Sequence, residues 1–353
     1  MGFEGHLLEA IEGARNCALN VAAVKKGESV LILMRNTSDM RIAEALGAVC
    51  REIGAVVHVT ILEEPSERFA KASPLTRAAM EMADVIFGNI LIDHSFARVK
   101  GARFVGLYMK DVEGFTGPGA RLHPDIVFKI CELAEKQWKS GKTMTVTLPL
   151  GTTLTAKIVK PSYAFGHVAG PLQKGEFTNW SGGFGGLCLW PEWTANGEVY
   201  FDTVTTFSER TRTPLKWTVR DGRVVKVEGE PQHVEFIERQ IKSGGKDADH
   251  FGEIMIGLCP TARIQFNSMF NGLYLETERH AGVMHCAVGS STDLEDDNGN
   301  PKVPSVRPSI HLDCMNLRPT IKVDDEYSIK DGRLTALDHP EVQALARKYG
   351  VAF

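Results

Sequence analysis

SVLILM, at Ser29–Met34, is a short apolar run typical of a buried strand, and the residues that follow it decide the fold. Arg41–Ile53 (RIAEALGAVCREI) has apolar residues at the spacing of one helix face, and Val56–Ile61 (VVHVTI) is a second strand-like run. Two strands joined by a helix at this spacing form a parallel pair. We therefore predict a strand–helix–strand unit over residues 29–61.

The same alternation continues to about residue 140. It predicts, in order, a helix, two strands and a longer helix at Pro74–Ala83, Asp84–Phe87, Arg103–Tyr108 and Pro124–Ser140. Such a pattern predicts a parallel sheet covered by helices, so residues 1–140 are expected to form a Rossmann-like or flavodoxin-like α/β domain. The first strand runs into Arg35–Asp39 rather than a GxGxxG turn, and the chain has no GxxxxGK[ST] run, which disfavours a nicotinamide or nucleotide cofactor.

After residue 140 the pattern changes to hairpins. Thr143–Leu150 with Leu154–Val159 forms one candidate, and a second is centred on the turn pair Asp221–Gly222 between two alternating strands. Helical patterns follow at Gln232–Ser243 and Pro340–Tyr349. We expect residues 141–353 to form a larger α+β domain that is rich in strands and carries the metal-binding and catalytic residues.

The composition excludes several classes of function. The chain has 353 residues, 43% hydrophobic and 24% charged, with a formal net charge of -4, so we expect no nucleic-acid partner. No segment approaches the roughly 18 apolar residues of a membrane span, and no secretory leader is evident, so we expect a cytoplasmic protein that acts on a small molecule. The seven cysteines form no CxxC pair, which argues against disulfides or a cysteine zinc site.

The segment Ser309–Asp313 has the pattern of a strand that presents a metal. His311 and Asp313 are two residues apart in an apolar setting, so their side chains point to the same face of an extended chain. Glu253, beside another apolar run, completes a three-ligand face suited to Fe(II), Mn(II), Zn(II) or Co(II). Glu278 and His285 lie in the same part of the chain and are candidate catalytic groups.

Structural explanations of these residues compete with the functional one. Glu253 could cap a turn, His285 could be a core histidine with both nitrogens satisfied, and Asp313 could pair with Arg318. Leu275–His280 could be a charged edge strand outside any site. Two cysteines adjoin the candidate ligands, and strand alternation is expected to turn both of them away from the site: Cys286 and Cys314.

Three segments, taken in order, resemble a known signature: Gly252–Ala262, Glu278–Gly289 and His311–Asp313. They resemble the aminopeptidase T family of metallopeptidases, and more closely the related 2,5-dihydroxypyridine 5,6-dioxygenases, which share that fold. The resemblance covers most of the second domain and is weaker in the first. It implies a ring-cleaving dioxygenase with one metal ion, Fe(II) favoured, acting on a small hydroxylated aromatic or pyridine compound. It also implies a homodimer or larger homo-oligomer.

Two differences from the peptidases favour the dioxygenases. The peptidases bind a second ion through a further glutamate, and the corresponding segment here, Ser181–Gly186, has no carboxylate. The dioxygenases have a His-Ser pair at the end of a strand in the first domain, which assigns His94 as an acid/base group facing the substrate. One difference opposes them, because they use a histidine where this chain has Glu253.

Three interpretations therefore stay open. In a dioxygenase, His94 or His285 takes the proton of a substrate hydroxyl. In a metallohydrolase, whether aminopeptidase-like or acting on a small amide, Glu278 is the general base of a one- or two-metal site. The third is a metal-stabilised binding protein without turnover. Four aromatic residues could wall an aromatic substrate or simply belong to the core: Trp180, Phe184, Trp190 and Trp193.

Overall fold

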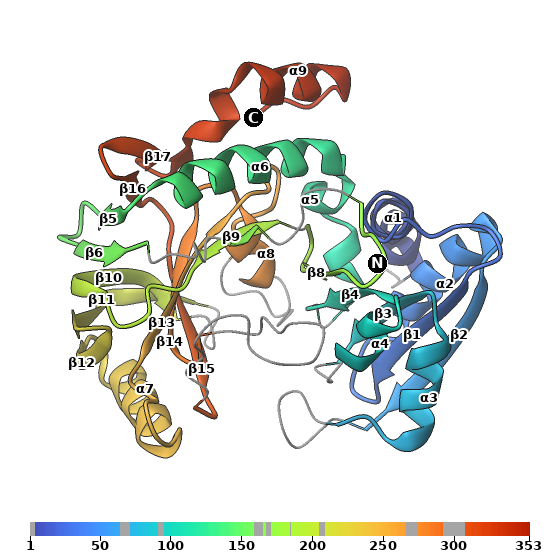
Figure 1. The fold of residues 1–353 in the computed structure, drawn as a ribbon, viewed down its shortest axis with the longest axis horizontal. Helices are drawn as coiled ribbons and strands as arrows, with labels where there is room; N and C mark the ends of the chain where they lie inside the picture. The colour runs from blue at the N-terminus through green and yellow to red at the C-terminus, as the bar shows by residue number, and fades with distance from the viewer. Residues whose placement is uncertain are drawn as a thin grey trace.

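The computed structural model describes residues 4–63, 71–90, 95–109, 111–158, 165–166, 171–183, 185–204, 209–265, 274–291 and 308–353. Two sheets lie side by side, each with its own helices, and Figure 1 shows the smaller one in blue and teal except for its strand at residues 177–180, which is yellow-green. One is parallel and the other antiparallel, which confirms the predicted fold class.

The smaller sheet has the strand order β2-β1-β3-β4-β8, and every neighbouring pair is parallel. Its strands are β1 (Ser29–Arg35), β2 (Val56–Leu62), β3 (Val85–Asn89), β4 (Arg103–Leu107) and β8 (Phe177–Trp180). The first four follow the sequence prediction closely. β8 comes from beyond residue 140, yet it pairs with β4. The domain limits of 1–140 and 141–353 stay a prediction.

Helices cover both faces of the smaller sheet because side chains alternate along β1. Val30 and Ile32 pack in the main core with α2 (Arg41–Ile53), near α1 (Glu4–Arg15) and the π-helical turn η1 (Asn16–Val21). Leu31 and Leu33 point the other way, toward α3 (Pro74–Met82) and α4 (Ser95–Val99). This is the layered arrangement that the alternating strands and helices predict.

The larger sheet is antiparallel and curls round in Figure 1, with the order β18-β17-β16-β5-β6-β10-β15-β14-β13-β9-β7. Its strands begin with β5 (Thr143–Thr147), β6 (Thr153–Lys157), β7 (Phe165–Gly166), β9 (Gly186–Leu189) and β10 (Asn196–Val204). They continue with β13 (Phe251–Gly257), β14 (Met284–Gly289), β15 (His311–Asn316), β16 (Thr320–Val323), β17 (Glu326–Lys330) and β18 (Arg333–Leu334). The hairpin of β11 (Glu209–Arg220) and β12 (Arg223–Glu228) branches from β10. Its turn residues have positive φ, as predicted: Asp221 at 46° and Gly222 at 69°.

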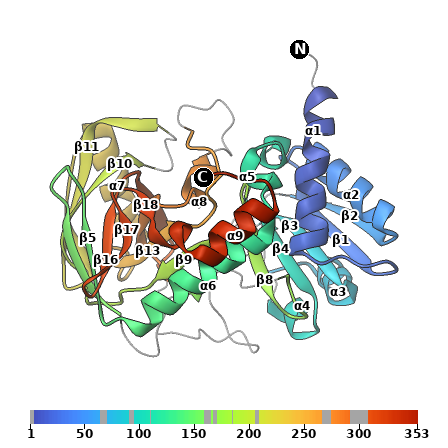
Figure 2. The same cartoon turned by 90° about the horizontal axis from the view of Figure 1, so that it is seen from above.

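A long helix, α6 (Pro124–Ser140), joins the two sheets, and Figure 2 shows α9 (Pro340–Lys348) lying alongside it. The fully buried Trp138 of α6 donates a hydrogen bond from Nε1 to Ser328 of β17 at 2.8 Å. The remaining helical segments are η2 (Val112–Phe115), α5 (Pro118–Arg121), α7 (Pro231–Ser243), α8 (Tyr274–Arg279) and η4 (Thr335–Asp338). In the described part of the chain, no helix is long and apolar enough to span a membrane.

Candidate metal centre

Three adjacent antiparallel strands, β13, β14 and β15, bring the candidate ligands onto one face of the larger sheet. Glu253 pairs with Ala287, which in turn pairs with Asp313, so the two carboxylates lie on one row across the sheet. His311 lies two residues before Asp313 on the same face, and His285 is two residues before Ala287. The period of two along each strand therefore gathers all four side chains, as the sequence predicts.

The distances between their polar atoms show that these side chains lie together. Oε1 of Glu253 lies 3.4 Å from Nε2 of His285, and Oε2 lies 3.6 Å from Nε2 of His311. The same nitrogen of His311 is 3.2 Å from Oδ1 of Asp313. Glu253 therefore lies between two imidazoles, with one carboxylate oxygen toward each.

The donor set suits a metal ion, although the geometry is incomplete. Among the described residues, no group of three or more His, Cys, Asp or Glu side chains is arranged so that it could hold a metal ion as it stands. Ligands about 2.0–2.2 Å from one ion, at angles of 90° to 110°, put their donor atoms about 3.0–3.5 Å apart. The separations of 3.2 Å and 3.6 Å at His311 are close to that range, so small side-chain movements would place Glu253, His311 and Asp313 on one ion.

Buried polar atoms without partners support the presence of a site. Oε1 of Glu278 and Nδ1 of His285 have no hydrogen-bond partner in the described part of the chain, and each residue is only 4% exposed. His311 is better anchored, because its Nδ1 lies 2.9 Å from the carbonyl oxygen of Ser290. A donor role for Nδ1 in that hydrogen bond leaves Nε2 as the nitrogen available to a metal.

Mutual electrostatics shift the titration of this cluster. Burial alone would raise the pKa of Glu253, but a hydrogen bond from His285 and the charges of His311 and His285 lower it below its ordinary value. Burial raises the pKa of Glu278 to about 7. Burial would lower the pKa of His285, yet the nearby carboxylates of Glu278 and Glu253 raise it.

The structural alternatives account for the cluster poorly. Arg318 forms its ion pair with Asp331 at 2.7 Å rather than with Asp313. Glu253 lies within a strand and caps no turn, and Nδ1 of His285 is unsatisfied. The proposal that residues 275–280 form an edge strand is wrong, because α8 covers residues 274–279. A helix there places Glu278 where its charge acts on His285.

The cysteine prediction is confirmed, since Cys286 and Cys314 face each other across β14 and β15 and are fully buried in the main core. The sequence did not indicate Cys188, whose Sγ lies 3.3 Å from Oε1 of Glu253. Its strand, β9, pairs with β13 so that Cys188 lies opposite Met255. The run at 186–189 is too short to predict a strand, so the sequence does not indicate toward which face the side chain of Cys188 points.

Two predicted residues, His94 and Phe184, lie outside the described residues. The other proposed aromatic wall residues differ in their surroundings. Trp180 belongs to the main core, which was the structural alternative for this residue. Its Nε1 donates a hydrogen bond to the carbonyl oxygen of Gly114. Trp190 packs in a small separate cluster with Cys188 and Met255, and Trp193 is 39% exposed. Of the three described aromatic residues in this set, only Trp190 therefore lies close to the candidate centre.

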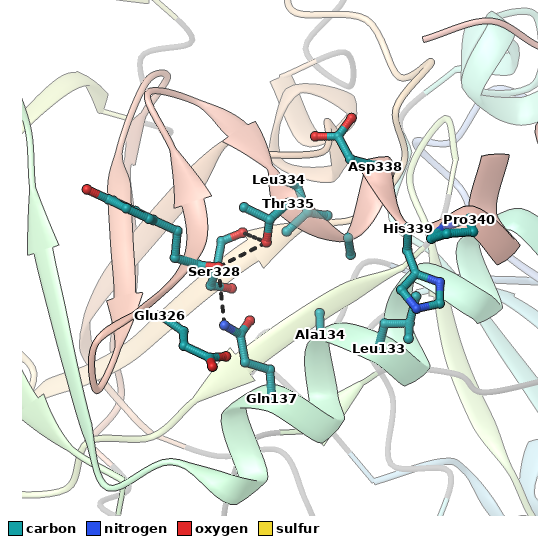
Figure 3. A pocket seen from close by; sticks show the side chains of 12 residues that line it. Leu133, Ala134, Gln137, Glu326, Ser328, Leu334, Thr335, Asp338, His339 and Pro340 are labelled. Atoms are coloured by element: carbon teal, nitrogen blue, oxygen red, sulfur yellow. Dashed lines mark hydrogen bonds between the residues drawn. The ribbon is translucent and has the colours of Figure 1, made fainter.

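A cavity of about 480 Å³ lies elsewhere, between α6 and the segment from β17 to the start of α9 (Figure 3). Its lining contains none of the predicted site residues. Its polar groups are largely bonded to neighbours: Oγ1 of Thr335 donates to the carbonyl oxygens of Tyr327 and Ser328, and Gln137 donates to Tyr327. We therefore place the chemistry at the strand face with Glu253 and not in this cavity.

Comparison with known proteins agrees with the resemblance in the signature segments. The sequence family model of the 2,5-dihydroxypyridine 5,6-dioxygenases matches residues 120–336, which is more than half of the chain. The match includes all the described candidate metal-binding and catalytic residues. The chain belongs to this family. It is therefore an enzyme of the dioxygenase type. No curated protein sequence gives a significant match.

Two solved structures share the fold over nearly the whole length. The 2,5-dihydroxypyridine dioxygenase from Pseudomonas putida KT2440 is 18% identical, with a TM-score of 0.72, and the match covers 93% of this chain and 97% of that one. Wild-type AmpT from Thermus thermophilus is 13% identical, with a TM-score of 0.58, and the match covers 94% of this chain and 100% of that one. Both relatives suspected from the sequence are thus found.

Proposed function

We propose that this enzyme is a mononuclear, metal-dependent dioxygenase that opens the ring of a small hydroxylated aromatic or pyridine compound. The observation that carries the proposal is the position of Glu253 between two imidazoles, with Asp313 beside one of them, in a chain of this family. Glu253, His311 and Asp313 would hold the ion. One imidazole and two carboxylates suit Fe(II), which we favour, and also Mn(II), Zn(II) or Co(II).

When bound, a divalent ion lowers the pKa of a coordinated ring hydroxyl and allows reaction with dioxygen. The protein supplies the orientation and the proton acceptors. The carbonyl of Ser290 fixes the ring of His311, and the thiol of Cys188 lies against Glu253. His285, buried beside Glu253 with a free Nδ1, can hold the proton that leaves the hydroxyl, and we assign His94 the same kind of role.

The absence of a further carboxylate favours one ion over two. Described residues 181–183 and 185–186 offer only serine and glycine, and a Cβ added at Gly182 would lie 3.0 Å from Glu276. That glutamate is engaged by Arg263, whose Nε lies 2.8 Å from Oε2. We further propose a cytoplasmic homodimer or larger homo-oligomer that binds neither nucleic acid nor membrane.

A metallohydrolase is the second candidate, because Glu278 and His285 lie together and Glu278 has the raised pKa of a usable base. Anaerobic loading with Fe(II), followed by addition of oxygen and 2,5-dihydroxypyridine, is expected to give oxygen uptake with loss of the aromatic absorbance. Release of p-nitroaniline from Leu-p-nitroanilide under the same loading, without oxygen uptake on any dihydroxylated ring, would establish the hydrolase instead.

A further inference from the structure

A buried guanidinium lies beside the candidate metal centre and has no ion-pair partner among the described residues. Arg279, the last residue of α8, is only 6% exposed. Within the described part of the chain, its Nε has no hydrogen-bond partner, and the hydrogen bond found for its Nη1 is a weak one to the sulfur of Met255, at 3.8 Å. Among the described residues, no carboxylate lies within 4.0 Å of it. A buried cation is costly unless it is paired, so this arrangement calls for a physical explanation.

Another buried arginine of this chain has its charge compensated in the usual way, by an ion pair. Arg103 is 5% exposed and forms an ion pair with Glu28 at 2.5 Å, with a second hydrogen bond to the carbonyl of Ala23. The charge of Arg279 acts electrostatically on the carboxyl group of Glu278, but the two groups form no ion pair. The planar fork of Arg279 thus keeps donors that a carboxylate could accept in a bidentate geometry.

The surroundings of Arg279 are apolar and lie on the same face as the candidate ligands. Cys188, Trp190 and Met255 form a cluster separate from the main core. Met255 follows Glu253 by two residues on β13, so the two side chains share a face about 7 Å apart. The absence of a side chain at Gly186 lets Met255 and Arg279 pack against its backbone. A Cβ at this position would lie 1.8 Å from Cε of Met255 and 3.2 Å from Nη1 of Arg279.

We propose that Arg279 binds an anionic group of the substrate, so the ring that is cleaved carries a carboxylate or similar acidic substituent besides its hydroxyl groups. The ring lies along Met255 and Trp190, with its hydroxyl end toward Glu253 and its acidic end at Arg279. The substrate class rests on the proposed function, whereas the anion-binding role of Arg279 does not.

The test measures binding of unreactive ligands, so that it does not depend on turnover. Affinities for benzoate and for benzamide, its neutral analogue of similar shape, are measured calorimetrically on chelator-stripped protein and on Zn(II)-loaded protein. The variants are Arg279→Met, Arg279→Lys and, as a matched surface control, Arg318→Met, whose side chain is 70% exposed. Benzamide affinity and the melting temperature of each variant report whether the site stays folded.

We expect the wild-type and Arg318→Met proteins to bind benzoate at least about tenfold more tightly than benzamide, because a charge-assisted hydrogen bond is lost with the amide. Arg279→Met should bring this ratio to about one with benzamide affinity unchanged, and Arg279→Lys should keep part of it. Equal affinities for the two ligands in wild type, or a preference that survives Arg279→Met, would overturn the proposal. A variant that loses stability but keeps the preference would make Arg279 a structural counter-charge for Glu278.

The test of anion binding by Arg279 can fail or succeed independently of the test of dioxygenase activity. Oxygen uptake with neutral 2,5-dihydroxypyridine tests the dioxygenase without Arg279. Adding the carboxylated ring 2,5-dihydroxybenzoate tests the substrate class, and we expect its kcat/KM to fall about tenfold or more in Arg279→Met, mainly through KM. A fall of the same size for the neutral substrate would count against a contact with the acidic group.

Discussion

Replacing Glu253 by Gln should weaken binding of Fe(II) or Mn(II) at least about 70-fold. The substitution keeps the shape of the side chain and removes the charge that lies 3.6 Å from Nε2 of His311 and 3.4 Å from Nε2 of His285. At an effective dielectric of about 20, two unit charges 3.6 Å apart attract by about 5 kcal/mol, and a bound divalent ion lies nearer still. Even if burial of the carboxylate offsets half of this energy, the loss is on the order of 2.5 kcal/mol, or roughly 70-fold.

The assay is an anaerobic titration with Mn(II), followed by the decrease of the free-ion magnetic resonance signal. Glu276→Gln is the matched control, because Glu276 is also a buried glutamate, 1% exposed, but is bound by Arg263 at 2.8 Å. The control should keep wild-type affinity even if its melting temperature falls. Wild-type affinity in Glu253→Gln, or an equal loss in Glu276→Gln, would refute the assignment of Glu253 as a ligand.

His94→Ala should lower kcat by about 100-fold while the metal content per chain stays the same; loss of the metal would contradict an acid/base role. Cys188→Ala should lower metal affinity by about tenfold, since its thiol lies 3.3 Å from Glu253, and unchanged affinity would show that the contact positions nothing. In the metal-free protein, burial raises the pKa of Glu278 to about 7, so the folded state keeps a proton that the unfolded state has already released, and stability falls as pH rises from about 4.5 to 7. Glu278→Gln should therefore gain up to about 3 kcal/mol relative to wild type across this range in urea unfolding; a pH-independent difference would argue against the raised pKa.

The sequence predicts those strands and helices whose hydrophobic periodicity matches the faces that they bury in the structure. The alternation from Ser29 to Ile61 gave the parallel sheet, because strands buried on both faces and an amphipathic helix have distinct periods. The pair His311 and Asp313 could be placed on one face for the same reason. Its convergence with Glu253 is a hypothesis from the apolar run beside that residue and from ligand chemistry, which the family resemblance supports; local pattern alone cannot establish it, since the pairing of β13, β14 and β15 is long-range.

The rest depended on information that a single sequence does not carry. Residues 275–280 alternate in charge and resemble an edge strand, yet tertiary packing makes them the helix α8. The contact of Cys188 with Glu253 requires the register of β9 against β13, and the short run at 186–189 is too brief to indicate a strand. Nothing in the sequence distinguishes Arg279 from a surface arginine, because only its surroundings show that its charge is buried and has no ion-pair partner among the described residues.

The central claim is that Glu253, His311 and Asp313 bind a single exchangeable ion, and metal content tests it most directly. Protein is stripped with chelator, loaded anaerobically with Fe(II), passed through a desalting column and analysed for iron per chain. We predict one iron per chain in wild type and almost none in His311→Ala. Wild-type protein that retains no iron, or His311→Ala protein that retains as much as wild type, would contradict the account.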